Sequence, residues 1–342
     1  MDIQKDVALA DFSTMRLGGK ARYLVHISDK NALVDALAWA DEHKLKTIVI
    51  GGGSNIVWGD KGFDGLVIVN HILGFKIHPE DKEFSYVTVG AGENWDSVVK
   101  RTVAAGLHGI EALSLIPGSA GATPVQNVGA YGQEIADSLV SVEAYDNVHN
   151  KFITIPNKDC AFGYRTSRFK TADKGRFVIV GLTFRLRHIN PRPPHYPAVA
   201  NYLREHRINV VTPKTLRKAV IAIRSSKLPD PTKVANNGSF FANPIVGTTA
   251  YNSLAKEYPE MPHWDVSKTK VKLSAAWLIE HAGFKNFSDK ETGMATWPSQ
   301  PLVLVNNHAK TTKDLLKFRD TIISAVHKKF SIHLEQEPEL IG

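Results

Sequence analysis

Residues 116–132 read IPGSAGATPVQNVGAYG, a long glycine-rich stretch without any charged residue. Hydroxyl and amide side chains, among them Ser119, Thr123, Gln126 and Asn127, lie between the glycines. Glycine has no Cβ, so the backbone at these positions can approach a bound molecule closely. We expect this loop to wrap a ligand that is polar and partly aromatic.

A second glycine-rich segment occurs earlier, where KTIVIGGGSN spans residues 46–55. A short buried strand leads directly into three glycines, and the exposed amides of such a turn make an anion nest. Neither GxGxxG nor Gly-Lys-Ser/Thr is present. The two segments together indicate one extended dinucleotide between two units, while a tight turn or two unrelated flexible loops remain the alternatives.

The composition describes a globular chain of 342 residues, which favours two or three domains. Cys160 is the only cysteine, so a reducing compartment is expected. No signal sequence and no apolar run near 20 residues is found, and we predict a cytoplasmic protein without a membrane partner. The formal net charge of +8 is consistent with polyanionic small molecules, with nucleic acid, or simply with a basic surface.

The hydrophobic pattern predicts a mixed α+β fold. Ser28 is expected to cap the first helix, and Thr212 to cap a later helix with Pro213 at its first position. The proline-rich segment 187–197 reads as a boundary or an extended loop. Expected strands cover 21–27, 46–50, 65–70, 85–92, 139–146, 151–156, 177–186, 302–306 and 331–335. Expected helices cover 29–43, 93–106, 213–224 and 274–283, and a long helix starts at Thr311 or Thr312.

Two further stretches contain polar groups suited to chemistry. In CAFGYRTSRF, residues 160–169, Tyr164 and Arg165 would be strand neighbours on opposite faces. In NNGSFFANP, residues 236–244, the pair Asn237-Gly238 predicts a turn, with Ser239 directly before a strand. On turn chemistry alone, Ser239 is an ordinary hairpin serine.

GGGSN, IPGSAGATPVQNVGAYG, FGYRTSRF, KLPDP and NNGSFFANP, followed by LVLVN and a terminal LEQE, occur in one order along the chain. In this order and spacing, nearly the whole chain resembles the UDP-N-acetylenolpyruvoylglucosamine reductase family, in the subtype with a tyrosine-bearing substrate loop. The resemblance implies a two-part FAD-binding domain of the vanillyl-alcohol-oxidase/PCMH type and a C-terminal α+β substrate-binding domain. The implied parts are 1–70, 71–211 joined by the tail 331–342, and 212–330.

The resemblance also implies cofactors. FAD would be bound without a covalent link, since neither glycine loop holds histidine or cysteine, and NADPH would be the co-substrate. No metal is implied, and a monomer that binds small molecules is expected. The implied FAD-binding residues are Gly51, Gly52, Gly53, Ser54, Asn55, Pro117, Gly118, Ser119, Thr123, Asn127, Gly129 and Val180.

The implied reaction reduces the enolpyruvyl group of UDP-N-acetylglucosamine enolpyruvate to give UDP-N-acetylmuramate, a precursor of peptidoglycan. A hydride from N5 of reduced FAD adds to the alkene. Arg165 would stabilise the negative charge that develops, Ser239 would donate the proton, and Glu337 would complete the catalytic trio. Pro338 follows Glu337, so Glu339 remains the alternative. The implied substrate-binding residues are Tyr164, Tyr196, Lys227, Asn243 and Gln300.

Two rival functions would each explain part of these features. Another FAD-linked oxidoreductase of the same fold, acting on an alcohol or a sugar lactone, would share the glycine loops but would not need the trio. A nucleic-acid-binding protein without enzymatic activity would explain the basic charge alone; it predicts colourless protein and salt-sensitive binding.

Overall fold

The computed structural model describes residues 1–192 and 196–342. Part of the proline-rich segment predicted at 187–197 therefore lies outside the described residues. The chain divides into two compact units, each built from segments that are distant in sequence. Unit 1 comprises Met1–Val7, Ala21–Gly52 and Asp64–Ser226. Unit 2 comprises Ala8–Lys20, Gly53–Phe63 and Lys227–Gly342. The three domains implied by the resemblance stay a prediction.

Unit 1 is built on two sheets. A four-stranded sheet has the order β1-β2-β5-β3, and a five-stranded sheet has the order β11-β10-β12-β7-β6. Its strands are β1 (Ile3–Ala8), β2 (Lys20–Ile27), β3 (Lys46–Ile50), β5 (Phe63–Asn70), β6 (Phe75–Pro79), β7 (Phe84–Gly90), β8 (Gly129–Ala130), β9 (Gln133–Glu134), β10 (Leu139–Asp146), β11 (Lys151–Pro156) and β12 (Phe177–Arg187). Its helices are α1 (Lys30–Glu42), α2 (Trp95–Ala104), α3 (Ile135–Ser138), α4 (Pro197–Glu205) and α5 (Pro213–Lys227).

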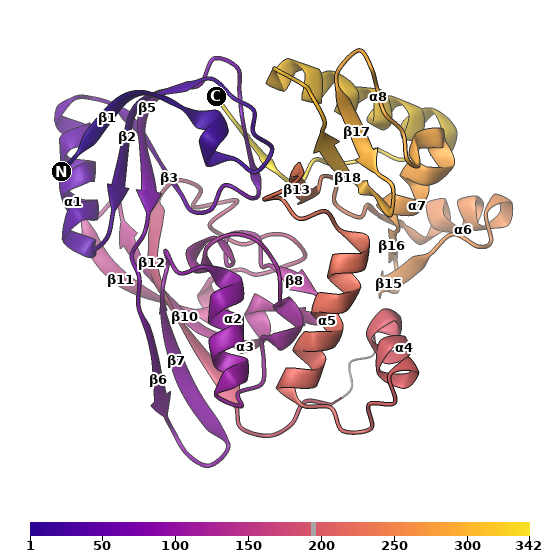
Figure 1. The fold of residues 1–342 in the computed structure, drawn as a ribbon, viewed down its shortest axis with the longest axis horizontal. Helices are drawn as coiled ribbons and strands as arrows, with labels where there is room; N and C mark the ends of the chain where they lie inside the picture. The colour runs from indigo at the N-terminus through magenta and orange to yellow at the C-terminus, as the bar shows by residue number, and fades with distance from the viewer. Residues whose placement is uncertain (193–195) are drawn as a thin grey trace. The chain divides into compact units, whose positions relative to one another are not determined.

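Each sheet of unit 1 buries one face against a helix. Leu33 and Ala36 of α1 pack on the four-stranded sheet, and Trp95 and Val98 of α2 pack on the five-stranded sheet (Figure 1). Apolar residues three and four positions apart lie on one side of a helix, which is why these helices have one buried face. The start of α2 is joined to the glycine loop 116–132 by backbone hydrogen bonds from the Trp95 amide to the Gly118 carbonyl at 3.0 Å and from the Ala120 amide to the Glu93 carbonyl at 2.8 Å.

Unit 2 contains small sheets and one long helix. The strands are β4 (Ile56–Trp58), β13 (Ala235–Ser239), β14 (Ile245–Gly247), β15 (His263–Ser267), β16 (Lys270–Leu273), β17 (Met294–Trp297), β18 (Gln300–Asn306) and β19 (Glu339–Ile341). The helices are α6 (Thr248–Glu257), α7 (Ala275–Ile279) and α8 (Thr312–Phe330). Leu315, Ile322 and Val326 of α8 are fully buried in the core of this unit. The sheet β13-β18-β17 carries Ser239 at the end of β13, and β19 pairs in parallel with β4.

Side-chain oxygens cap the first turns of α1, α5 and α8, and the residue predicted to cap α1 is wrong. Asp29, not Ser28, caps α1, because its Oδ1 accepts a hydrogen bond from the Ala32 amide at 2.9 Å. Thr212 caps α5 as predicted, since its Oγ1 accepts from the Thr215 amide at 3.1 Å. Thr311 caps α8 with a complete capping box.

The last predicted strand, 331–335, is wrong. This segment is irregular, although Ile332 and Leu334 are buried, and the terminal strand is β19. An alternation of apolar and polar residues requires only that every second side chain is buried. Segment 331–335 meets this requirement without pairing as a strand. Among the described residues, no helix is long and apolar enough to cross a membrane.

Candidate active site

The two glycine-rich segments contact each other within unit 1. A Cβ added to Gly51 would lie 1.9 Å from Ser119 Oγ, and one added to Gly52 would lie 3.0 Å from Gly118 Cα. Real Cβ atoms do not come this close to their neighbours, so glycine is required for the approach at Gly51. The sequence prediction that both segments serve one ligand is consistent with this contact.

The same contact gathers backbone donors. Within the described part of the chain, the amides of Gly52, Gly118 and Ser119 donate no hydrogen bond to a protein acceptor. Ser119 is buried. Amides grouped in this way on a glycine-rich backbone form a nest that suits a phosphate or diphosphate group. The residues present therefore fit the diphosphate of FAD.

Gly51→Ala is expected to lower both stability and FAD content. The added methyl group overpacks the contact with Ser119, which typically costs about 1–3 kcal/mol. Thermal unfolding and the ratio of flavin to protein absorbance measure the two effects. The double variant Gly51→Ala/Ser119→Gly removes the clash and should recover part of the loss. Gly247→Ala is the control, because a Cβ there meets no atom within 4 Å.

Two other predicted flavin residues in unit 1 are engaged within the protein. Thr123 Oγ1 donates to the carbonyl of Ala120 at 2.7 Å. Asn127 is buried, and its Nδ2 donates to Glu134 Oε2 at 2.7 Å and to the Gly163 carbonyl at 3.2 Å. These bonds set the shape of the glycine loop. Any direct contact of the Thr123 and Asn127 side chains with a flavin stays a prediction.

For the remaining predicted flavin residues, the structure shows chain positions and backbone contacts. Pro117 directly precedes Gly118, and the Gly129 carbonyl accepts a hydrogen bond from Arg165 Nη2 at 2.9 Å. Val180 lies in β12 at an irregularity of the ladder with β10, and its carbonyl accepts from the Ala91 amide. Gly53, Ser54 and Asn55 belong to unit 2, because the unit boundary falls after Gly52.

Tyr164 and Arg165 are not strand neighbours, and that prediction is wrong. They are the two central residues of a tight turn, closed by hydrogen bonds in both directions between Gly163 and Thr166. Arg165 has φ +54°, in the left-handed region that non-glycine residues rarely adopt. Its guanidinium lies 5.3 Å from the Tyr164 ring centroid. Backbone strain of this kind often accompanies functional residues, and Arg165 is a candidate on that ground too.

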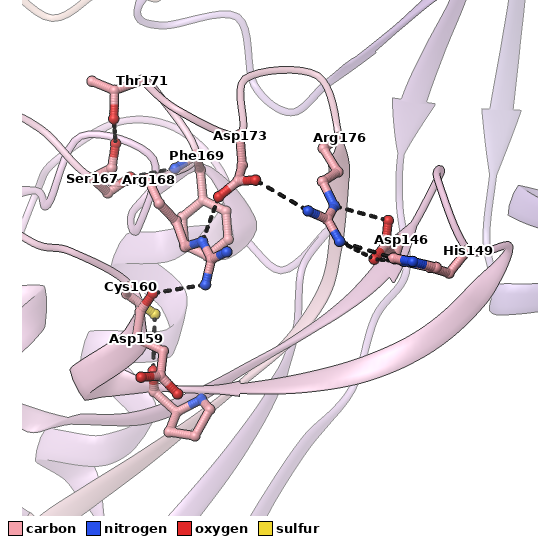
Figure 2. Close-up of polar contacts among 11 residues, drawn as sticks. Asp146, His149, Asp159, Cys160, Ser167, Arg168, Phe169, Thr171, Asp173 and Arg176 are labelled. Carbon is pink, nitrogen blue, oxygen red and sulfur yellow. Dashed lines mark hydrogen bonds and ion pairs between the residues drawn. The ribbon is translucent and has the colours of Figure 1, made fainter.

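The segment that carries this turn is braced by polar contacts (Figure 2). Arg168 Nε donates to Asp173 at 2.7 Å, and Arg176 joins Asp173 to Asp146 with a bond of 2.8 Å to Asp146 Oδ2. The Arg176 hydrogen bond holds the pKa of Asp146 far below its usual range. A lowered folded-state pKa means that this stabilisation is present above the unfolded-state pKa and is lost as the pH falls.

Ser167 connects the braced segment to the glycine loop. It is buried, and its Oγ donates to the Val125 carbonyl at 2.6 Å while accepting from the Phe169 amide. Together with the bond from Arg165 to Gly129, this contact holds the arginine turn and the glycine loop in one frame.

Cys160 lies in the same segment, and its reactivity is expected to be low. Burial raises the pKa of its thiol to about 11, and the side chain is inaccessible. Two pH units above the ordinary value of 9.0 correspond to about 100-fold less thiolate near pH 8. Ellman's reagent should therefore modify the native protein at least about 100-fold more slowly than the unfolded protein. Rapid modification of the folded holoprotein at one thiol per chain would contradict this description.

In unit 2, Ser239 ends β13 and pairs with Val303 of β18. The predicted turn at Asn237-Gly238 is wrong, because both residues lie within β13, at a bulge where Gly238 has φ +69°. Phe240 and Phe241 are both buried and anchor the segment after Ser239 in the core. Among the described residues, no protein group accepts from or donates to the Ser239 hydroxyl. It is thus available to a ligand.

Asn237 links this strand to the first glycine segment within unit 2. Its Nδ2 lies 3.3 Å from the Ser54 carbonyl and 3.2 Å from the Ile56 carbonyl and from Thr14 Oγ1. The residue is buried, and its Oδ1 has no hydrogen-bond partner in the described part of the protein. A buried acceptor without a partner is costly, which points to a donor on a bound molecule or an ordered water.

The C-terminal tail brings Glu337 close to Ser239. The Glu337 amide donates to the Phe240 carbonyl at 2.9 Å, directly after Ser239. Glu339 instead begins β19, and its amide donates to the Asn55 carbonyl at 2.9 Å. The structure thus places Ser239 and Glu337 together in unit 2, whereas Arg165 belongs to unit 1.

The predicted substrate residues are spread over both units. Lys227 is exposed at the end of α5, and Gln300 begins β18. Asn243 Oδ1 accepts from the Ala275 amide at 3.0 Å, so its Nδ2 is the group left for a ligand. Tyr196 is 40% exposed at the start of α4.

Two polar residues near Tyr196 were not predicted as site residues. The ring of Tyr131 contacts that of Tyr196 with centroids 5.0 Å apart, and burial raises the pKa of the Tyr131 hydroxyl while the nearby charge of Arg224 opposes this rise. Burial lowers the pKa of Arg224, and its Nε is buried without a hydrogen-bond partner among the described residues. The sequence feature that could have identified Tyr131 as a site residue is its position inside the glycine loop. No group of three or more His, Cys, Asp or Glu in residues 1–192 and 196–342 is placed to hold a metal ion.

Two family models match the chain. A model described as FAD binding domain matches residues 21–148. A model described as UDP-N-acetylenolpyruvoylglucosamine reductase, C-terminal domain matches residues 230–341. The predicted FAD-binding part with a separate C-terminal part is confirmed by these matches.

Curated proteins resemble the whole chain. UDP-N-acetylenolpyruvoylglucosamine reductase of Ralstonia nicotianae is 39% identical, with 97% of each chain covered. The protein of the same name from Dechloromonas aromatica is 40% identical, with 99% of each chain covered. The crystal structure of UDP-N-acetylenolpyruvylglucosamine reductase from Thermus caldophilus covers both chains completely, at 22% identity and a TM-score of 0.68. This last likeness shows a shared fold.

Proposed function

The chain belongs to the UDP-N-acetylenolpyruvoylglucosamine reductase family, and from this membership we propose that it is an FAD-containing, NADPH-dependent oxidoreductase of peptidoglycan precursor synthesis. Its reaction reduces the enolpyruvyl group of UDP-N-acetylglucosamine enolpyruvate to give UDP-N-acetylmuramate. The observation that carries this proposal is 40% identity over 99% of both chains. The nest of amides at Gly52, Gly118 and Ser119 supports the cofactor independently.

FAD, when bound, supplies the redox chemistry by passing a hydride from NADPH to the substrate. The nest formed by Gly52, Gly118 and Ser119 would hold its diphosphate, and the other predicted flavin residues would complete the binding loop. Asn237 adds a buried acceptor beside Ser54.

The catalytic roles are assigned by chemistry. Negative charge develops next to the substrate carboxylate, and Arg165 offers a permanent charge with fixed donors. Ser239 donates the proton to the neighbouring carbon. Glu337 is preferred to Glu339 because its backbone is bonded to Phe240, the residue after Ser239. A protonated Glu337 would avoid repulsion of the anionic intermediate.

Substrate binding uses groups suited to a nucleoside diphosphate sugar. Lys227 provides a positive charge for the diphosphate, and Asn243 and Gln300 provide neutral donors. Tyr164 and Tyr196 add an aromatic surface and hydroxyl groups. The net charge of +8 is then explained by two polyanionic substrates. We place the enzyme in the cytoplasm as a monomer, without a nucleic-acid or membrane partner.

The decisive experiment follows NADPH oxidation by the purified yellow protein with and without UDP-N-acetylglucosamine enolpyruvate. Oxidation that depends on this substrate, with one UDP-N-acetylmuramate formed per NADPH, supports the proposal. Turnover with an alcohol or a sugar lactone, and rapid reoxidation by oxygen, would replace it with the related oxidase function. Colourless protein that binds DNA or RNA in a salt-sensitive manner would remove both.

A further inference from the structure

The side chain of Gln336 spans the residue that we assign as the catalytic glutamate. Its Nε2 donates to the Pro338 carbonyl at 2.7 Å, so a hydrogen-bonded ring encloses Glu337. Its Oε1 accepts from Arg319 Nη1 of α8 at 2.8 Å. Both ends of the Gln336 carboxamide are therefore engaged, one by the tail itself and the other by a fixed guanidinium.

The backbone on the other side of Glu337 is also fixed. The Ala242 amide donates to the Glu335 carbonyl at 3.0 Å, and the Glu337 amide donates to the Phe240 carbonyl at 2.9 Å. These bonds tie the tail to the residues that follow Ser239. Between the isolated bridge at Gln336 and the pairing of β19 with β4, the side-chain bonds of Gln336 brace the chain at Glu337.

The contact between Arg319 and Gln336 borders an open hollow of about 470 Å³ that is also lined by Ile323 and His333. The Arg319 side chain is 22% exposed and forms an ion pair with Asp320 at 2.7 Å. A small solute can therefore reach the place where the guanidinium lies. Loss of this side chain leaves the core residues of α8 untouched, so the fold should tolerate it.

We propose that Arg319 and Gln336 are positioning residues that hold Glu337 in register with Ser239. The inference rests on the proposed function, since it assumes that Glu337 acts on the substrate. Arg319 acts through Gln336 and touches neither substrate nor cofactor. Displacement of a reacting group by about 1 Å commonly costs on the order of 10²-fold in rate.

Arg319→Ala is the first test, with the two half-reactions followed separately by stopped-flow flavin absorbance. Reduction of the holoenzyme by NADPH should be unchanged, while reoxidation by the enolpyruvyl substrate should slow about 10- to 100-fold, with little change in the substrate KM. Added guanidinium chloride should restore part of the lost rate, because the open hollow admits it. Asp320→Asn is the control: it removes the exposed ion pair and leaves the bond between Arg319 and Gln336.

A double-mutant cycle with Glu337→Gln separates this inference from the proposed function. If Arg319 acts through Glu337, Arg319→Ala should slow the Glu337→Gln enzyme little further. Additive losses, equal losses in both half-reactions, or no rescue by guanidinium would overturn the positioning role. If Glu337→Gln alone reoxidises normally, the assignment of Glu337 fails first, and the positioning role of Arg319 and Gln336 fails with it.

Discussion

Ser239→Ala should reduce normally with NADPH and then fail to reoxidise with UDP-N-acetylglucosamine enolpyruvate. The substitution removes only the hydroxyl that we propose as the proton donor, so the reduction of the flavin by NADPH should not change. Loss of a positioned general acid typically lowers the rate about 10²- to 10⁴-fold. Stopped-flow absorbance at the flavin band measures both steps on one sample.

Two further substitutions make this test specific. Ser239→Cys retains a group that can donate a proton and should keep part of the rate. Ser274→Ala removes a serine of the same unit that caps α7, which costs about 1 kcal/mol of stability but no catalytic group. Normal reoxidation by Ser239→Ala would assign the proton to another donor.

Arg165→Met should show the second large effect, a loss of about 10²- to 10³-fold in reoxidation by the enolpyruvyl substrate. Methionine keeps much of the side-chain length but removes the guanidinium donors that we propose stabilise the developing negative charge. Arg165→Lys keeps the charge and loses the planar fork, so its rate should fall between those of Arg165→Met and the unchanged enzyme.

Arg168→Met is the matched control for this prediction. Arg168 lies in the same braced segment, and its guanidinium bonds Asp173 rather than a ligand group. Its loss should lower the melting temperature and leave the reoxidation rate near normal. Equal rate losses for Arg165→Met and Arg168→Met would mean that the segment matters only for structure.

Patterns that depend on local chemistry were predictable from the sequence. The caps of α5 and α8 follow from a threonine whose hydroxyl can accept from a backbone amide in the first turn. The glycine segments indicated a phosphate ligand because their composition leaves amides exposed and permits close approach. Family resemblance supplied the proposed catalytic residues, which local patterns did not.

Features that depend on tertiary contacts were not predictable. Nothing local identifies Tyr164-Arg165 as a turn, because its left-handed arginine is held by bonds to Gly129 and by the braced segment around it. Asn237-Gly238 carries a strong turn signal, yet pairing with β18 incorporates it into a strand as a bulge. The pairing of β19 with β4 joins segments almost 300 residues apart, and no short-range pattern reports such a partner.

The pairing of β19 with β4 has a consequence for biosynthesis. Every segment of unit 1 precedes residue 227, so this unit can begin to assemble while the remainder of the chain is still being made. Unit 2 combines residues 8–20 and 53–63 with a strand at 339–341 that is synthesised much later. Contacts between segments this distant in sequence form slowly. The segment holding Gly53, Ser54 and Asn55 therefore completes its environment only once residues 339–341 have been synthesised, and cofactor capture by that segment should be a late event in maturation.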